Sequence, residues 1–392
     1  MQARRTQLAS CPRTLLAGVA VVVALALAGP AAPAHGSPLD GNGVWIWYVS
    51  QSGGSAEKIA KKANKHNVDT VLVKSSDAGN YWSQFSPGLV QRLHQGGLDV
   101  CAWQFVYGKD PRPEARKGAQ AVENGADCLV IDAESHYEGK YKAAHRYIDE
   151  LRDHVGKDYP VALASFPYVD YHPSFPYSVF LGKGGAQFNV PQMYWKTIGT
   201  SVRRVYSHTY EVNAPYDRPI FPLGQTYLNP SRKQVVKFRK LGRKYDAGGV
   251  SWWSWQETHG HEWRWIGKKL NNDTGQASAS QASAAAGYPV VGAGDRGDLV
   301  VWTQQLLEAH DHSVEIDGTY GDEMVEAVRA FQAATGLAPT GAVDDATWRE
   351  LLTREPEPVN WSRRGSPAGA SAPDSASLEA LRFELPLTPG RP

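Results

Sequence analysis

The chain has 392 residues, with 41 basic and 40 acidic side chains and a formal net charge of +1. This length fits one large domain and a smaller one, and the balanced charge excludes a strong electrostatic attraction to nucleic acid or to an anionic membrane. The 13 Trp and 18 Tyr residues are the unusual part of the composition. Aromatic rings fill cores, but they also stack on the apolar faces of sugars, so the composition is compatible with a carbohydrate ligand.

The amino terminus has the pattern of a secretory signal peptide, which we assign to residues 1–34. Arg4, Arg5 and Arg13 precede the apolar run LLAGVAVVVALALAG, and the small residues APA at 32–34 offer a cleavage site. The run is short for a membrane span. We therefore expect a secreted protein with no membrane attachment after cleavage.

From about residue 40 to residue 270, strand-like segments alternate with amphipathic, helix-like ones. Alternation of this kind over ~250 residues is typical of a (β/α)8 barrel. An open doubly wound sheet is the competing architecture, but no glycine-rich phosphate loop follows the first strand. We therefore predict an α/β fold, a (β/α)8 TIM barrel at 40–270. Its eight strand candidates are 44–49, 70–74, 99–107, 128–134, 160–165, 188–195, 219–224 and 248–255.

Only two cysteines, Cys101 and Cys128, remain after the signal peptide. Both fall in apolar strand candidates, and export permits oxidation, so a disulfide and a pair of buried thiols both stay open. Two cysteines alone do not make a structural zinc site. In THGHEW (258–263) two histidines stand beside an acid, but no third ligand follows at a known spacing. We predict no metal and no cofactor.

Residues 271–288 are mainly Ser, Ala, Gln and Gly, which predicts a flexible linker. Residues 289–352 then carry three helical patterns, at 299–309, 322–335 and 344–352, which predict a small all-α three-helix domain. The remaining segment, 353–392, is rich in Pro, Ser, Ala and Gly, and we expect a disordered tail there.

The three-helix segment resembles a peptidoglycan-binding domain. GDRGDLVVWTQQLL, IDGTYGDEMVEAVRAFQAATGL and PTGAVDDATWREL follow that family's pattern in order and spacing. The resemblance implies attachment to cell-wall glycopeptide, but it identifies no ligand residues, because the glycines suit turns and the apolar positions suit a core. The matching positions are Gln304, Asp317, Gly318, Gly321, Ala327, Val328, Phe331, Gln332, Gly336, Leu337, Gly341, Thr347 and Trp348.

Asp132 and Glu134, in CLVIDAES, end the fourth predicted strand. Barrel enzymes keep their chemistry at the carboxyl ends of the strands, and side chains two apart on a strand share a face. Two carboxyls held close raise at least one pKa, and a carboxyl that stays protonated can act as general acid on a glycosidic oxygen. The motif alone is common by chance. Its barrel position, the signal peptide and the neighbouring domain make the pair our catalytic candidate.

The barrel also resembles the family 25 glycoside hydrolases, muramidases that cleave the peptidoglycan glycan, and more loosely the family 18 chitinase-type barrels. DTVLVKSSDAG resembles their second strand with Lys74, GLDVCAWQFVYG their third, and LVIDAES their fourth-strand D-x-E. The resemblance implies that Glu134 is the acid and Asp132 its partner. Those muramidases also carry an Asp at the end of the first strand, where this chain has Trp45, Trp47, Tyr48 and Ser50.

Further side chains near strand ends are candidates for substrate binding, since aromatic rings stack on pyranoses and glutamine can hydrogen-bond an acetamido group. For each aromatic one, a place in the core is the alternative. The two carboxylates Asp77 and Glu257 are also candidates to replace the absent first-strand Asp, and for each a solvated position in a loop is the alternative. The predicted substrate-binding residues are Lys74, Asp77, Trp103, Tyr107, Gln192, Tyr194, Gln225, Trp253 and Trp255, with Trp195 and Tyr227 beside them.

The sequence thus predicts a secreted, cell-wall-associated glycoside hydrolase that cleaves peptidoglycan-type glycan by carboxylate acid/base catalysis. Its expected partner is peptidoglycan or a related cell-wall polysaccharide, and we expect a monomer that binds no nucleic acid. The alternative is a non-catalytic peptidoglycan- or polysaccharide-binding protein with a degenerate barrel site. The absent first-strand Asp favours that alternative.

Overall fold

The computed structural model describes residues 36–268 and 287–371. The predicted signal peptide, all but the last two residues of the predicted linker, and residues 372–392 of the predicted tail lie outside the described residues. In the described ranges no helix is both long enough and apolar enough to cross a membrane.

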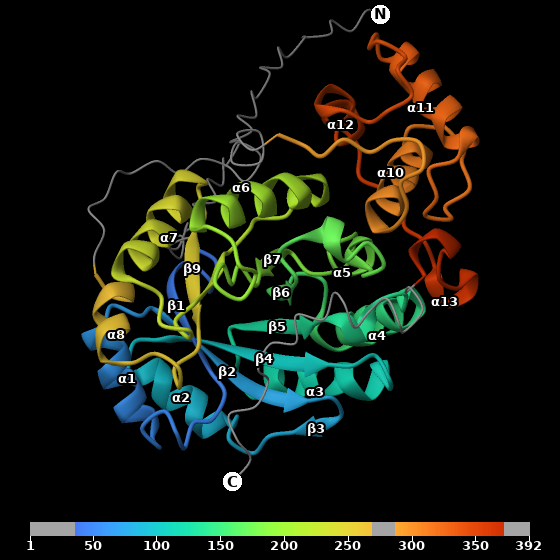
Figure 1. The fold of residues 1–392 in the computed structure, drawn as a ribbon. Coiled ribbons are helices and arrows are strands. Elements are labelled where there is room, and N and C mark those ends of the chain that lie inside the picture. The colour runs from blue at the N-terminus through green and yellow to red at the C-terminus, as the bar shows by residue number, and fades with distance from the viewer. Residues whose placement is uncertain (1–35, 269–286, 372–392) are drawn as a thin grey trace, which may run out of the picture. The chain divides into compact units, whose positions relative to one another are not determined.

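Eight parallel strands form a nearly closed barrel, as predicted from the sequence (Figure 1). They run in chain order around the ring, and β9 pairs with β1. Two isolated parallel bridges, Asn189 with Ile220 and Gln192 with Leu223, link the β7 and β8 segments. A short antiparallel strand, β3 (Asn80–Tyr81), pairs with β2. The barrel strands are β1 (Gly41–Ile46), β2 (Thr70–Asp77), β4 (Asp99–Val106), β5 (Cys128–Ala133), β6 (Val161–Ser165), β7 (Phe188–Pro191), β8 (Leu223–Gln225) and β9 (Gly249–Trp253).

Helices surround the strands (Figure 1). Serine residues cap the amino ends of four of them, α1, α2, α6 and α7, where each hydroxyl accepts a backbone N–H of the first turn. The helices of this region are α1 (Ala56–Lys65), α2 (Pro87–Gln95), α3 (Pro111–Glu123), α4 (Tyr141–Val155), α5 (Tyr177–Phe180), α6 (Val202–Asn213), α7 (Arg232–Lys244) and α8 (Gly260–Ile266), with 3₁₀ turns η1 (Ser135–Tyr137), η2 (Val169–Tyr171) and η3 (Ala214–Tyr216).

The barrel lumen has its own core, distinct from the core between strands and helices. Alternate residues of β4 and β5 point inward, among them Trp103 and Val130. Cys101 and Cys128 are direct cross-strand partners on these two strands and form a disulfide within the lumen core. Of the two alternatives that the sequence leaves open, the structure has the bridge.

The carboxyl-terminal region contains the predicted helices as α10 (Asp298–Ala309), α11 (Asp322–Ala334) and α12 (Asp345–Leu351). Two glutamines of the sequence pattern hold its turns. The Gln304 side-chain oxygen accepts the Gly318 N–H at 2.9 Å, and the Gln332 oxygen accepts the Gly341 N–H at 2.9 Å. Both glycines have positive φ, a conformation that side-chain-bearing residues disfavour. These positions therefore serve the fold.

Asp298, the first residue of α10, is buried against the barrel. Its two carboxylate oxygens accept hydrogen bonds from the Tyr141 hydroxyl (2.6 Å), the Tyr216 hydroxyl (2.7 Å), and the hydroxyl and backbone N–H of Ser178 (both 2.7 Å). One turn further along, the Trp302 indole N–H donates to the Pro215 carbonyl at 2.6 Å. The α10 helix thus contacts the barrel through a buried polar cluster.

Residues 353–371 contain two short elements, α13 (Trp361–Arg364) and η4 (Ala368–Ala370). The buried Trp361 ring lies 5.0 Å from the ring of Tyr141, and Ala370 is also buried. This segment differs from the disordered tail expected from residue 353, because one tryptophan in a polar stretch supplies enough apolar surface to pack it.

Candidate active site

Asp132 and Glu134 meet at the carboxyl end of the barrel. Asp132 is the second-last residue of β5, and Glu134 lies between the end of β5 and the start of η1. The Gln192 side chain, just beyond β7, donates its amide to Asp132 Oδ1 at 3.0 Å and to Glu134 Oε1 at 2.8 Å. One amide group therefore holds both carboxyl groups face to face. Sequence reasoning put these three residues near one rim, but the bridging role of Gln192 was not expected.

Both carboxyl groups have a raised pKa. Burial is the main cause for each, since only 4% of Asp132 and 8% of Glu134 is exposed. The negative charge of Glu134 raises the pKa of Asp132 further, while Lys74 and the Gln192 hydrogen bond lower it. Two buried carboxyls in contact cannot both ionise easily, so the loss of a proton from one makes its loss from the other less favourable.

Lys74 lies inside the lumen with no exposed surface. Its ammonium forms an ion pair of 2.6 Å with Asp77 and lies over the rings of three tryptophans, Trp47 at 4.0 Å, Trp82 at 4.7 Å and Trp103 at 4.8 Å. We call this group the lysine cage. Cations within ~6 Å of an aromatic centroid are attracted by the ring face.

A β-bulge explains how Asp77 reaches Lys74. The pairing of β2 with β4 shifts register between Lys74 and Ser76. An extra residue in a strand lets positions three apart face the same side, and bulges of this kind redirect side chains near active sites. Asp77 also accepts the Tyr107 hydroxyl at 3.1 Å, so two of the predicted binding residues hold it.

Trp47 lies directly after β1, in the stretch that the sequence showed to lack an acid. The Gln84 side chain holds it by donating to its carbonyl at 2.7 Å and to the Lys74 carbonyl at 2.9 Å. The end of the first strand thus contributes an aromatic face to the lysine cage. Neither Trp82 nor Gln84 stood out in the sequence, because both lie in the loop between β3 and α2 and not at the end of a barrel strand.

A small cavity of about 50 Å³ opens beside Glu134. Glu134 and Gln192 form its polar side. The remaining lining is mainly aromatic and comes from the segments after β6 and β7, with Phe166, Pro167, Tyr168, Tyr171, His172, Tyr194, Thr197 and Ile198. Of this set, only Glu134, Gln192 and Tyr194 were candidates in the sequence. The loop FPYVDY (166–171) has no periodic pattern that would indicate a pocket.

The other predicted binding residues divide by location. Trp253 lies at the lumen mouth, with its ring 5.4 Å from that of Trp103. Trp103 and Gln225 have no exposed surface, and the Gln225 side chain accepts the Lys196 N–H at 2.8 Å, which holds a loop. Trp255 lies outside the lumen, packed 4.7 Å from Trp263, because β9 ends at Trp253 and the chain turns. Trp255 is therefore separate from the carboxyl pair.

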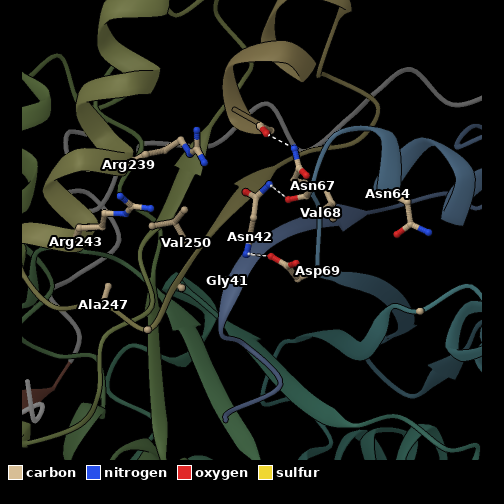
Figure 2. A pocket seen from close by; sticks show the side chains of 15 residues that line it. Gly41, Asn42, Asn64, Asn67, Val68, Asp69, Arg239, Arg243, Ala247 and Val250 are labelled. Atoms are coloured by element: carbon tan, nitrogen blue, oxygen red, sulfur yellow. Dashed lines mark hydrogen bonds between the residues drawn. The ribbon is translucent and has the colours of Figure 1, made fainter. Parts of the chain in front are cut away.

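A larger cavity, about 910 Å³, lies at the opposite, amino-terminal end of the strands (Figure 2). Its polar groups support the fold. The Asn42 backbone N–H donates to Asp69 at 2.9 Å, its side chain donates to the Asn67 carbonyl at 2.9 Å, and Arg239 donates to the Trp265 carbonyl at 3.1 Å. This end of a barrel governs stability rather than chemistry, so the carboxyl end is the candidate active site.

One curated protein and two solved structures are similar to parts of the chain. It is 33% identical over 81 residues to an uncharacterized protein in the bpoA1 3'region of Kitasatospora aureofaciens, a match covering 19% of this chain and 69% of that protein. It is similar to the spore cortex-lytic enzyme SleL of Bacillus cereus (TM-score 0.43, 12% identity, covering 58% of this chain and 73% of that one). It is also similar to the catalytic domain of a hyperthermophilic chitinase from Pyrococcus furiosus (TM-score 0.44, 11% identity, 58% and 93%).

The two structural likenesses are too distant to carry an argument about chemistry. The carboxyl-terminal helices are assigned more firmly. Residues 296–351 match the family model described as a putative peptidoglycan binding domain, and they span α10, α11 and α12. The chain therefore carries a domain of the putative peptidoglycan binding family behind a parallel α/β barrel.

Proposed function

We propose that the protein is a cell-wall-associated glycoside hydrolase that cleaves peptidoglycan-type glycan, with Glu134 as general acid. The observation that carries the proposal is the single Gln192 amide bound to both Asp132 and Glu134 at the carboxyl end of the barrel. Glycosidases need one protonated and one ionised carboxyl at the scissile bond. A buried pair that shares one proton meets this need.

Glu134 is the acid in this proposal because it lines the cavity beside the pair, whereas Asp132 does not. It would protonate the glycosidic oxygen as the bond to the sugar breaks. Asp132 would then stabilise the positive charge that develops on the sugar ring. Water completes hydrolysis and restores the proton to the pair.

The closeness of the two carboxyls favours retention of configuration. The Gln192 side-chain nitrogen lies 3.0 Å from Asp132 Oδ1 and 2.8 Å from Glu134 Oε1. The distance between these two oxygens therefore cannot exceed the sum of the two hydrogen-bond lengths. Inverting enzymes separate their carboxyls by ~6.5–9.5 Å to admit a water molecule between them. This pair is too close for that arrangement.

The cavity beside Glu134 supports an N-acetylated sugar as substrate. A short substituent such as an acetamido group would enter this small cavity. Gln192 and Glu134 place polar groups beside it, and its aromatic side can contact a methyl group. Together with the peptidoglycan binding domain, this supports a wall glycan.

The test is digestion of purified peptidoglycan, with the fragments identified by mass analysis. We expect the wild type to release reducing ends, and Glu134→Gln to abolish release while binding to the wall persists. Glu123→Gln, on the exposed end of α3, is the matched control and should digest normally. Intact glycan at high wild-type concentration would contradict the proposal.

A non-catalytic wall-binding protein is the second candidate. The observation that favours it is the small exposed area of the pair, which limits the access of a glycosidic oxygen to both carboxyls. In that case the wild type and Glu134→Gln would bind wall alike and neither would release fragments. The same digest therefore separates the two candidates.

A further inference from the structure

An exposed tyrosine stands at the edge of the cavity beside Glu134. Tyr171 lies in the 3₁₀ turn η2, after β6, and 50% of it is exposed. Among the described residues, two other large hydrophobic side chains are comparably exposed, Leu228 and Val290, and neither lines this cavity. Single exposed apolar residues are common on protein surfaces. The position of Tyr171, in the lining of a cavity next to the proposed acid, is what points to a ligand.

Contacts with α6 hold the Tyr171 ring in place. The Tyr168 ring meets it edge-on, with the centroids 5.2 Å apart and the planes at 78°, and the His208 ring of α6 lies 5.9 Å away. The carboxylate of Asp170, the preceding residue, lies 2.9 Å from His208 Nε2. Because the loop is tied to α6 beside Tyr171, a ligand that stacks on the ring loses little affinity in ordering it.

The following residue anchors the loop on its other side. The His172 ring stacks on the Phe166 ring with centroids 3.5 Å apart, and its Nδ1 lies 2.8 Å from a carboxylate oxygen of Glu138. Phe166 and His172 both line the cavity. One anchored loop, residues 166–172, therefore supplies part of the aromatic lining and the exposed Tyr171 ring together.

We propose that Tyr171 is a stacking platform for a second sugar ring of the glycan, next to the ring whose substituent enters the cavity. This inference rests on the proposed function in taking an N-acetylated wall glycan as the ligand. The cavity, at about 50 Å³, takes a short substituent, whereas an exposed aromatic face matches the apolar face of a whole pyranose. Tyr171 contacts the neighbouring ring and not the reacting atoms, so it determines specificity and affinity.

The test is calorimetric titration of full-length Glu134→Gln protein with a peptide-free peptidoglycan tetrasaccharide, which requires no turnover. Adding Tyr171→Ala should weaken binding by about threefold to tenfold, the range for one lost aromatic contact. Tyr171→Phe should keep the affinity because it keeps the ring. Tyr171→Leu should lose it, since an aliphatic side chain of similar bulk has no flat face. Val290→Ala, which removes another exposed apolar side chain, is the control and should bind like the parent protein.

Three results would overturn the inference: a parent protein that does not bind the tetrasaccharide, unchanged affinity in Tyr171→Ala, or equal affinity in Tyr171→Leu and Tyr171→Phe. The last result would mean that bulk at this position supports the loop. Failure of the proposed function is seen separately, because a wild type that binds the tetrasaccharide but leaves wall glycan intact keeps the platform and loses the catalysis. In a wild type that cleaves, Tyr171→Ala should raise KM and leave kcat unchanged.

Discussion

Asp298→Asn should change how the stability of the protein depends on pH. The Asp298 carboxylate is fully buried between α10 and the barrel and accepts four hydrogen bonds, from Tyr141, Tyr216 and twice from Ser178. Burial raises its pKa from an ordinary value of 3.8 to about 6, although all four hydrogen bonds lower it. Desolvation of the charge therefore outweighs the donors.

The size and sign of the effect follow from that shift. A rise of about two pH units corresponds to ~3 kcal/mol. Because the folded protein binds this proton more tightly than the unfolded chain, the Asp298 contribution to the free energy of unfolding is greatest below about pH 4 and falls as the pH rises to about 6. Asparagine does not titrate. The free energy of unfolding of the wild type minus that of Asp298→Asn should therefore decrease by ~3 kcal/mol across this window.

Urea unfolding at pH 4, 5, 6 and 7 measures this difference, since other titrating groups are common to both proteins and cancel. Asp344→Asn is the matched control with the opposite sign. Asp344 caps α12, and its hydrogen bonds with Thr347 lower its pKa, so that wild-type-minus-variant difference should rise with pH. A difference for Asp298→Asn that does not change with pH would refute the reasoning.

Two further predictions concern the lumen. Gln192→Met should raise the pKa of both Asp132 and Glu134, because it removes the hydrogen-bond donor that they share. A hydrogen bond to a charged group contributes about 1.5–3 kcal/mol. An unchanged carboxyl titration would contradict the bridging role. The double variant Cys101→Ser, Cys128→Ser should lose about 2–4 kcal/mol in urea unfolding, as for a disulfide closing a loop of this length. Equal midpoints for that variant and the oxidised wild type would argue against a stabilising bridge.

The fold was readable from the sequence because barrel strands are buried on both faces. The continuous apolar runs TVLVK and CLVIDAE begin where β2 and β5 begin, although β2 extends three residues beyond its run. The three helical patterns after 289 correspond to α10, α11 and α12. The packed segment after residue 353 was missed. The packing of this segment depends on the contact between Trp361 and Tyr141. These two residues are far apart in the sequence, so no local pattern indicates the contact.

The candidate site was predictable only where it follows strand geometry. Asp132 and Glu134 follow from the i, i+2 rule at the end of a strand. Lys74 and Asp77 are three apart and meet only because a bulge adds a residue to β2, which the sequence does not reveal. The predicted strand 248–255 extends two residues beyond the end of β9 at Trp253, and it therefore placed Trp255 at the mouth. The chain turns after Trp253, and the Trp255 ring packs outside the lumen against Trp263.

The absence of an acid at the end of the first strand is consistent with the other charges in the lumen. Among the described residues at the lumen mouth, three carboxyl groups, Asp77, Asp132 and Glu134, lie near the Lys74 ammonium. A further carboxylate at the end of the first strand would add its negative charge to theirs and raise the pKa of the pair further. Trp47 instead presents its ring to the ammonium at 4.0 Å, which supports the cation without adding a titratable group. An aromatic residue at the end of the first strand is thus compatible with a singly ionised pair, and its presence alone does not mark the barrel as inactive.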